Sequence, residues 1–186
     1  AFFNEDTGRR ILESHGGADI VTATNVFAHV DDIRSFAKGI EALLADDGVV
    51  IIEFPYLRDM IEQLYFDTIY HEHLSYLALT PLARLFADTG LRTFRVERVD
   101  LGASGPALRL FVCHTNAKHA VESSITEMLA EEREWGIDAP ARYEEFARRV
   151  AAVREKILDM VRRLNGEGSK VGAYCAPAKG NTLLNY

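Results

Sequence analysis

Residues 65–76, YFDTIYHEHLSY, bring together two histidines, one glutamate and three tyrosines. Histidine titrates near neutral pH, and a neighbouring carboxylate or phenol can set its tautomer and its pKa. Few segments that only pack a core are this rich in such groups. The pattern therefore favours a general acid–base cluster that includes Tyr70, Glu72 and His73. We refer to residues 65–76 as the YHEH segment.

Two other interpretations fit the same residues. His71 and His73 form a His-x-His pair, which with a nearby carboxylate could bind zinc and would suit a metal-dependent hydrolase. Such a site needs a third ligand, and no spacing in the sequence fixes one. Alternatively, these side chains are hydrogen-bonded polar groups at a surface or an interface.

The composition limits the kinds of partner and location that this protein can have. The net charge of −7 argues against nucleic acid or an anionic membrane as the main partner. Cys113 and Cys175 lie far apart and form neither a metal motif nor a disulfide framework, which fits a reducing compartment. No apolar run approaches the roughly 20 residues of a membrane span. We therefore expect a cytoplasmic protein without a resident metal.

The elements that must position the cluster begin with a βαβ pattern. Residues 20–24 form a short apolar run, residues 33–44 repeat apolar side chains at helical spacing behind a cap at Asp31 or Asp32, and residues 49–55 form a continuous apolar strand. In such units ligands bind at the carboxyl ends of the strands. The residues at these ends are Thr24, Asn25, Glu53 and Tyr56, and His29 follows shortly after the first strand.

The rest of the chain continues the α/β pattern and then becomes helical. Residues 80–90 predict a helix with Thr80 as N-cap and Pro81 at its first position, and residues 91–100 and 107–115 predict a hairpin around GASGP. Helices are expected at 120–136 and 139–165, followed by a strand at 171–175 and the start of another helix. The sequence therefore predicts an α/β fold with an antiparallel edge on a parallel sheet, a helical linker and a second α/β region.

Two loops could contact a ligand. YCAPAKGNT at 174–182 joins a strand to a helix start, where free backbone N–H groups and the Lys179 cation suit a phosphate or diphosphate. A helix cap with an exposed lysine explains the same residues equally well. The glycines of GASGPALR at 102–109 either form only a turn or let a substrate approach the backbone closely.

Three stretches carry a family resemblance: DIVTATNVFAHVDD (19–32), GVVIIEFPYLRDMIEQLYFDTIYHEHLSYLALTPLARLF (48–86) and GAYCAPAKGNTLLNY (172–186). They closely resemble the sugar C-methyltransferases, which are class I S-adenosylmethionine-dependent methyltransferases acting on a carbon of a nucleotide-linked keto-deoxysugar. At 102–109 the chain reads GASGPALR where this family usually has His-Gly-Gly-Ser-Leu-Arg.

The resemblance implies a domain order. Residues 1–116 would be the second half of a Rossmann-like methyltransferase domain, 117–168 a helical linker and 169–186 the start of a C-terminal α/β domain that helps to hold the sugar nucleotide. The chain starts without a methionine and stops about one turn into a helix. We therefore expect it to be part of a longer protein, whose cofactor-binding glycine loop and N-terminal zinc module lie outside it.

The resemblance also implies roles for individual residues. His73 is expected to remove a proton beside the sugar ketone, so that the enolate carbon takes the methyl group of S-adenosylmethionine without help from a metal. The further expected catalytic residues are Tyr70, Glu72 and His29; the cofactor-binding residues are Ala23, Thr24, Asn25 and His29; and the substrate-binding residues are Glu53, Tyr56, Tyr76, Arg109, Lys179 and Asn181. The expected partner is a small molecule, a nucleotide-linked sugar with a dTDP carrier. A non-catalytic nucleotide-sugar-binding module is the alternative.

Overall fold

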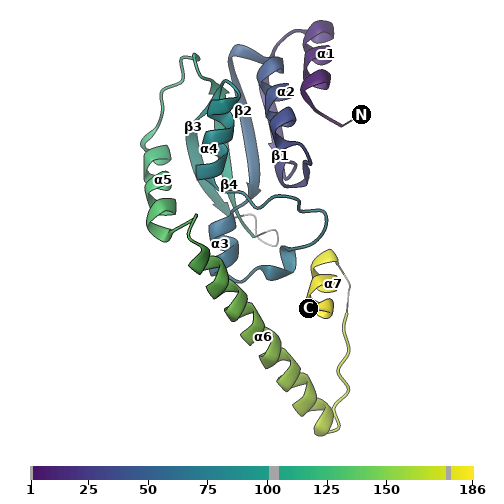
Figure 1. Ribbon diagram of the computed structural model, residues 1–186. Helices are drawn as coiled ribbons and strands as arrows, with labels where there is room; N and C mark the ends of the chain where they lie inside the picture. Colours follow the sequence, from purple (N-terminus) through teal and green to yellow (C-terminus); the bar gives the residue numbers. More distant parts are fainter. Residues whose placement is uncertain (1, 101–104, 175–176) are drawn as a thin grey trace.

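The computed structural model describes residues 2–100, 105–174 and 177–186. In this part of the chain the helices are α1 (Glu5–His15), α2 (Ile33–Leu43), α3 (Leu57–Glu62), α4 (Leu79–Asp88), α5 (Ser123–Trp135), α6 (Pro140–Gly166) and α7 (Ala178–Asn185), with 3₁₀ turns η1 (Phe27–His29) and η2 (Phe66–Thr68). The strands β1 (Ala18–Thr24), β2 (Leu44–Pro55), β3 (Leu91–Asp100) and β4 (Pro106–His114) form one sheet in the order β1-β2-β4-β3 (Figure 1). The predicted α/β fold, with parallel and antiparallel strands, is confirmed.

The parallel half of the sheet is the predicted βαβ unit. β1 pairs with β2, Thr24 lies beside Glu53, and α2 forms the crossover between the strands. The side chain of Asp32 accepts a hydrogen bond of 2.9 Å from the backbone N–H of Ser35, which satisfies a free donor at the start of α2. The carboxyl ends of β1 and β2 therefore lie side by side.

The antiparallel half is the predicted hairpin of β3 and β4. Within it β4 lies against β2, so that β3 forms the outer edge. Arg109 on β4 is placed directly opposite Glu53 on β2. Most of the predicted GASGP turn, residues 102–104, lies outside the described residues.

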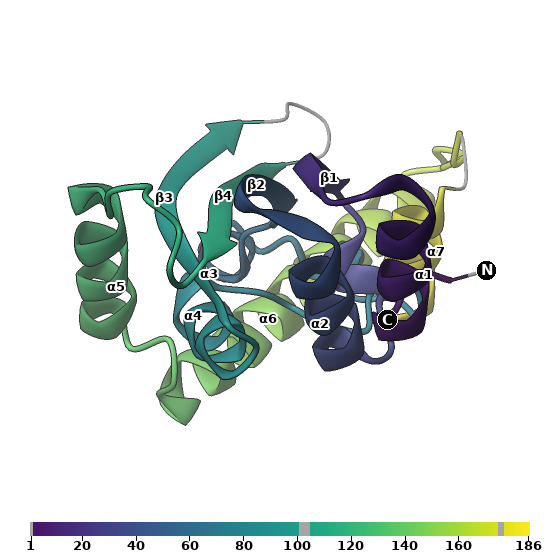
Figure 2. The same cartoon turned by 90° about the horizontal axis from the view of Figure 1, so that it is seen from above.

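The hydrophobic core lies on one face of this sheet. Val50, Ile52 and Phe54 alternate along β2 and are fully buried, as expected for the inward face of a strand. The helices α2 and α4 both lie on this side (Figure 2). On the opposite face Ile20 of β1 is 67% exposed. The sheet edge that carries the strand ends is thus supported from the helical side.

The start of α4 differs from the prediction. Leu79 and Thr80 already belong to the helix, Pro81 takes its third position, and Ala78 at the N-cap has no side chain that could accept a hydrogen bond. The carboxylate of Glu132 on α5 accepts hydrogen bonds from the N–H groups of Leu79 (2.8 Å) and Thr80 (2.7 Å). The prediction that Thr80 caps this helix was wrong, because an acceptor from a distant element takes that role.

Three further elements differ from those expected from the sequence. α1 was not predicted, although Asn4 caps it by accepting a hydrogen bond of 2.9 Å from the N–H of Thr7. α5 begins at Ser123, three residues later than expected. Residues 171–174 form no strand, because no described strand lies beside them to share hydrogen bonds, and Cys175 lies outside the described residues.

The C-terminal elements leave the sheet and then return. α6 has 27 residues, of which only Val150 is buried. α7 lies beside η2, where the rings of Phe66 and Tyr186 have centroids 5.6 Å apart and the guanidinium of Arg154 donates to the Tyr186 carbonyl. None of the described helices is long and apolar enough to cross a membrane. The return of α7 brings Lys179 toward the YHEH segment.

The crossing of α1 and α2 depends on two glycines. A Cβ atom on Gly8 would overlap the backbone carbonyl of Gly39. We expect Gly8→Ala to lower the free energy of unfolding by about 1–3 kcal/mol, although alanine is the better helix former. Gly166→Ala, where an added methyl group meets no atom within 4 Å, is the matched control and should leave stability unchanged or raise it. Equal stability of the two variants in chemical denaturation would contradict the close crossing.

Candidate active site

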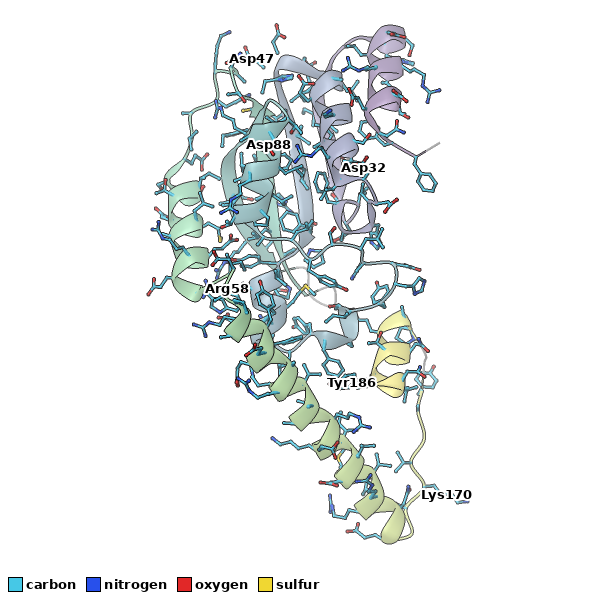
Figure 3. The ribbon with its side chains drawn as sticks, viewed as in Figure 1. Asp32, Asp47, Arg58, Asp88, Lys170 and Tyr186 are labelled. Carbon is cyan, nitrogen blue, oxygen red and sulfur yellow. The ribbon has the colours of Figure 1, made fainter. Side chains whose placement is uncertain are left out.

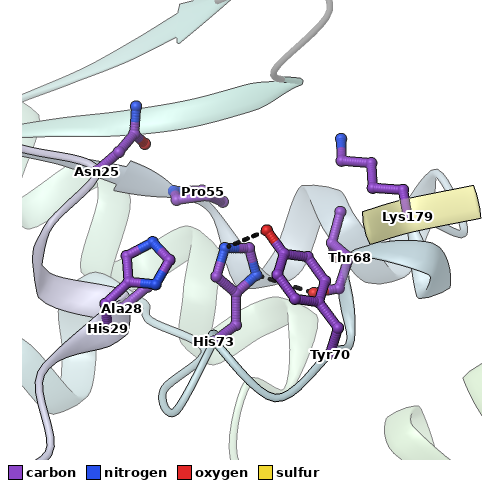
Figure 4. A pocket seen from close by; sticks show the side chains of 8 residues that line it. All are labelled: Asn25, Ala28, His29, Pro55, Thr68, Tyr70, His73 and Lys179. Carbon is purple, nitrogen blue, oxygen red and sulfur yellow. Dashed lines mark hydrogen bonds between the residues drawn. The ribbon is translucent and has the colours of Figure 1, made fainter. Parts of the chain in front are cut away.

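A pocket of about 340 Å³ lies where β1 and β2 end (Figure 4). It is lined by Asn25, Ala28, His29, Pro55, Thr68, Tyr70, His73 and Lys179. The lining residues come from the two strand ends, from η1, from the YHEH segment and from α7. Five predicted site residues, Asn25, His29, Tyr70, His73 and Lys179, are therefore brought together from distant parts of the chain.

His73 is held through its Nδ1 atom. Nδ1 lies 2.8 Å from the carbonyl oxygen of Thr68, and because a carbonyl oxygen only accepts, Nδ1 carries the proton. In the neutral ring Nε2 then has a free lone pair, and the hydroxyl of Tyr70 lies 3.3 Å from it as a donor. Burial lowers the pKa of His73 below its usual value of 6.5, and the charges of His29 and Lys179 act in the same direction. His73 is therefore a neutral base at pH 7.

Backbone hydrogen bonds give the YHEH segment its shape. The N–H of His73 donates to the carbonyl of Tyr70 at 3.0 Å, which closes a tight turn and brings the two side chains onto one side. The N–H groups of Leu74 and Ser75 both donate to the carbonyl of Ala28, at 2.8 and 3.1 Å. The segment is thereby attached to η1.

His29 is held in the same manner as His73. Its Nδ1 atom lies 2.7 Å from the carbonyl oxygen of Glu72, so Nδ1 is again the donor, and the ring centroids of His29 and His73 are 4.9 Å apart. Glu72 was predicted to act through its side chain. The structure leaves that side chain exposed, and Glu72 contributes its carbonyl oxygen to His29 and a negative charge that opposes the lowered pKa of His73.

Asn25 turns the chain at the end of β1. Its φ of 54° lies in the left-handed region, which asparagine tolerates better than most residues, and its N–H donates to the carbonyl of Glu53 at 2.8 Å. Of the predicted cofactor-binding residues, Asn25 and His29 line the pocket. The side chain of Ala23 is buried in the core and Thr24 is exposed, so the structure does not bring these two side chains into the pocket.

Glu53 and Arg109 were predicted to bind the substrate, and the structure pairs them with each other. The Nε and Nη2 atoms of Arg109 lie 2.9 and 2.7 Å from one carboxylate oxygen of Glu53. Glu53 is buried, whereas Arg109 also faces Glu97 at 3.7 Å. The pair sits beside the end of β1 but outside the lining of the pocket.

Tyr56 lies in the core rather than at the pocket. Its side chain is fully buried, and its hydroxyl donates to the sulfur of Met128 at 3.6 Å. Burial, followed by the negative charge of Glu132, raises the pKa of Tyr56. The structure therefore places Tyr56 in the core and not at the border of the pocket, where the sequence analysis expected it. The residue after a strand end can point to either side of the sheet, and the sequence does not show which.

The two remaining predicted residues lie near the pocket without lining it. The ring centroid of Tyr76 is 6.3 Å from that of His73, but Tyr76 lines a separate apolar pocket of about 200 Å³ against α3 and α6. Asn181 is exposed on α7, where its side chain accepts a hydrogen bond from Asn185. Sequence reasoning missed the role of Thr68, whose carbonyl fixes His73, because a backbone acceptor leaves no signal in residue types.

The proposed zinc pair does not converge. In the residues that the structure describes, no three His, Cys, Asp or Glu side chains are grouped closely enough to hold a metal ion. His71 is exposed, and Nδ1 of His73 is engaged by the Thr68 carbonyl.

Two family models match consecutive parts of the chain. Residues 2–96 match the methyltransferase domain, and residues 102–186 match the C-methyltransferase C-terminal domain. The methyltransferase domain covers more than half of the chain, so the chain belongs to the methyltransferase family. This confirms the predicted class, the S-adenosylmethionine-dependent methyltransferases, together with the predicted cofactor, and the match of the second half agrees with the resemblance to C-methyltransferases. The predicted boundaries at residues 116 and 168 stay predictions.

The chain is also similar to individual proteins. The chain is 41% identical over 184 residues to the C-methyltransferase NovU of Streptomyces niveus, and the match covers 99% of this chain and 43% of NovU. The chain thus spans less than half the length of this curated relative. Among solved structures, it is similar to the mitomycin 7-O-methyltransferase MmcR, with a TM-score of 0.45, 16% identity, and coverage of 60% of this chain and 39% of that chain.

The charge of Lys179 gives a test of the site's electrostatics. Because Lys179 helps to lower the pKa of His73, Lys179→Met should raise that pKa toward 6.5. The measurement is an NMR titration of the His73 ring between pH 4 and 9, a range of about 2.5 units around the usual histidine pKa. Lys170→Met, at the far end of α6 (Figure 3), is the matched control and should leave the titration unchanged. An equal response to both substitutions would show that Lys179 does not face His73.

Proposed function

We propose that the complete gene product transfers a methyl group from S-adenosylmethionine to a carbon atom of a nucleotide-linked keto-deoxysugar. The proposal rests above all on His73, a neutral imidazole whose proton is fixed on Nδ1 and whose Nε2 lies beside a phenol hydroxyl in the pocket. Methylation at carbon differs from methylation at oxygen or nitrogen, because a C–H bond must first be ionised. A base of fixed tautomer suits that step.

The first step is removal of the proton on the carbon beside the ketone. Nε2 of His73 takes this proton, and the electrons of the C–H bond move onto the ketone oxygen, which gives an enolate. The imidazolium that forms still donates from Nδ1 to the Thr68 carbonyl, so the same hydrogen bond that fixes the base also stabilises its protonated form.

Basicity alone does not drive this step. A C–H bond beside a ketone is a weaker acid than the imidazolium of histidine by roughly 12 pK units, or about 16 kcal/mol. A hydrogen-bond donor aimed at the developing oxyanion is typically worth about 3–4 kcal/mol. We assign this role to the Tyr70 hydroxyl, with His29 as a second donor from Nε2 when its ring is protonated. Both side chains line the pocket with His73.

S-adenosylmethionine, when bound, supplies the methyl group on a positively charged sulfur that the enolate carbon takes. The end of β1 fits this group, because Asn25 lines the pocket there and offers an amide oxygen, whereas contacts from Ala23 and Thr24 stay predictions. Lys179, whose positive charge would repel a sulfonium, lies on the other side of the two imidazole rings (Figure 4). We therefore place the cofactor on the Asn25 side of the pocket.

The opposite side of the pocket suits the substrate. Lys179, in the first turn of α7, offers a cation for a phosphate, and Asn181 lies on the same helix. We propose that Lys179 and Asn181 contact the nucleotide-linked sugar. A role of Arg109 and Glu53 in substrate binding stays a prediction, because the pair lies beside the end of β1. The dTDP carrier and the cytoplasmic location stay predictions.

Replacement of His73 tests the proposal. His73→Asn keeps an N–H group that can donate to Thr68 and removes the base at Nε2. We expect the complete gene product to lose turnover by a factor of about 10²–10⁴, while its affinity for S-adenosylmethionine in calorimetry stays nearly constant. Turnover is measured as release of S-adenosylhomocysteine with a dTDP-linked 4-keto-deoxysugar, and it should be absent without the sugar.

The matched control is His71→Asn. His71 is two residues away and exposed, so this variant should retain nearly the activity of the unsubstituted protein. Full activity of the His73 variant would remove His73 from the mechanism. A complete gene product that does not bind S-adenosylmethionine would contradict the whole proposal.

A further inference from the structure

Glu132 is a fully buried acid that takes no part in the steps above. It is 0% exposed and extends from α5 to the start of α4. One of its carboxylate oxygens accepts from the N–H of Leu79 at 2.8 Å and the other from the N–H of Thr80 at 2.7 Å. A buried carboxyl group is costly unless it is hydrogen-bonded, so its position calls for a physical explanation.

The two N–H groups that Glu132 binds are the free donors among the first four residues of α4. Leu79 and Thr80 are the first two residues of α4, and the third, Pro81, has no N–H. The N–H of Leu82 already donates to the carbonyl of Ala78 within the helix. A side chain more than 50 residues further along the chain thus completes the hydrogen bonding that a local N-cap normally provides.

The helix end that Glu132 holds follows closely after the YHEH segment. Only Leu77 and Ala78 separate the segment from α4. Leu77 is itself fixed, because its carbonyl accepts from the N–H of Leu57 at 3.0 Å and its backbone forms a bridge with Tyr56. Because only two residues intervene, a shift of the first turn of α4 would strain these Leu77 contacts and, through them, the segment that carries Tyr70 and His73.

The backbone that carries the Glu132 side chain is held by hydrogen bonds. Its own carbonyl accepts from the N–H groups of Gly136 and Ile137, both at 3.0 Å, which closes the end of α5. Gly136 has a φ of 82°, as expected for a helix-ending glycine. The carboxylate therefore projects from a fixed helix end into the core.

We propose that Glu132 is a positioning residue, which caps α4 and thereby fixes the carboxyl end of the YHEH segment and the orientation of Tyr70 and His73. This inference rests on the proposed function for the roles of these two side chains. Glu132 lies in the part that matches the C-methyltransferase C-terminal domain, whereas α4 and the YHEH segment lie in the part that matches the methyltransferase domain. Glu132 is thus one of the contacts between these two parts of the chain, which the pairing of β4 with β2 and β3 also joins.

Glu132→Gln tests this role. The amide keeps the size of the side chain and one acceptor, but it turns an NH₂ group toward one of the two backbone donors. Because a misplacement of about 1 Å in an active site can cost about 100-fold in rate, we expect kcat to fall by about 10- to 100-fold while KM for S-adenosylmethionine changes less than about twofold. The pKa of His73 in an NMR titration should rise toward 6.5, because a loosened segment admits water.

Asn4→Ala is the matched control. It removes the N-cap of α1, where Asn4 accepts from Thr7, and so lowers the melting temperature through the same kind of interaction far from the pocket. It should leave kcat and the His73 titration unchanged. If Glu132→Gln only lowers the melting temperature, as Asn4→Ala does, Glu132 is a structural residue and the proposal is wrong.

A second variant keeps the test decisive if Glu132→Gln folds poorly. Ala78→Ser in the Glu132→Gln background supplies a local hydroxyl to the N–H of Thr80. It should recover part of kcat and return the His73 titration toward that of the unsubstituted protein. No recovery in a folded double variant would contradict capping as the mechanism. If the unsubstituted protein has no methyltransferase activity and Glu132→Gln still shifts the His73 titration, the proposed function is wrong and the positioning role of Glu132 is retained.

Discussion

Two backbone carbonyl oxygens determine what the imidazoles of the pocket can do. Thr68 and Glu72 each accept a hydrogen bond from an Nδ1 atom, so that His73 and His29 are held as the same tautomer, with the proton on Nδ1. Without these acceptors each ring could rotate and place its proton on either nitrogen. Burial then keeps His73 neutral at pH 7, which makes it a base rather than a cation.

The rest of the fold serves to keep these carbonyls in place. The left-handed backbone of Asn25 turns the chain out of β1, which places η1 next to the strand ends. The carbonyl of Ala28 then holds the YHEH segment at Leu74 and Ser75, and Glu132 holds the start of the helix that follows. Each attachment is a hydrogen bond to backbone, so the geometry depends on the path of the chain more than on side-chain packing.

The sequence predicted the βαβ unit and the hairpin, and it placed Asn25 and His29 at one edge because strand ends of a parallel sheet meet there. The position of Tyr70, His73 and Lys179 in the same pocket followed from the family resemblance and not from the pattern of strands. The sequence did not predict Thr68 as the anchor of His73, because every residue carries a carbonyl. It placed Tyr56 at the pocket and Thr80 at a helix cap, whereas the structure buries Tyr56 and replaces the local cap with Glu132. These errors share a cause: buried tertiary contacts override local sequence preference.

In the proposed reaction, His73 ionises a carbon acid before any methyl group is transferred. This step can be observed alone as exchange of the hydrogen beside the ketone of a dTDP-linked 4-keto-deoxysugar with deuterium oxide, followed by NMR with S-adenosylhomocysteine in place of the methyl donor. We expect the complete gene product to catalyse this exchange and His73→Asn to abolish it. Exchange that is no faster than the uncatalysed rate, or that persists in the His73 variant, would contradict the role of His73 as the base.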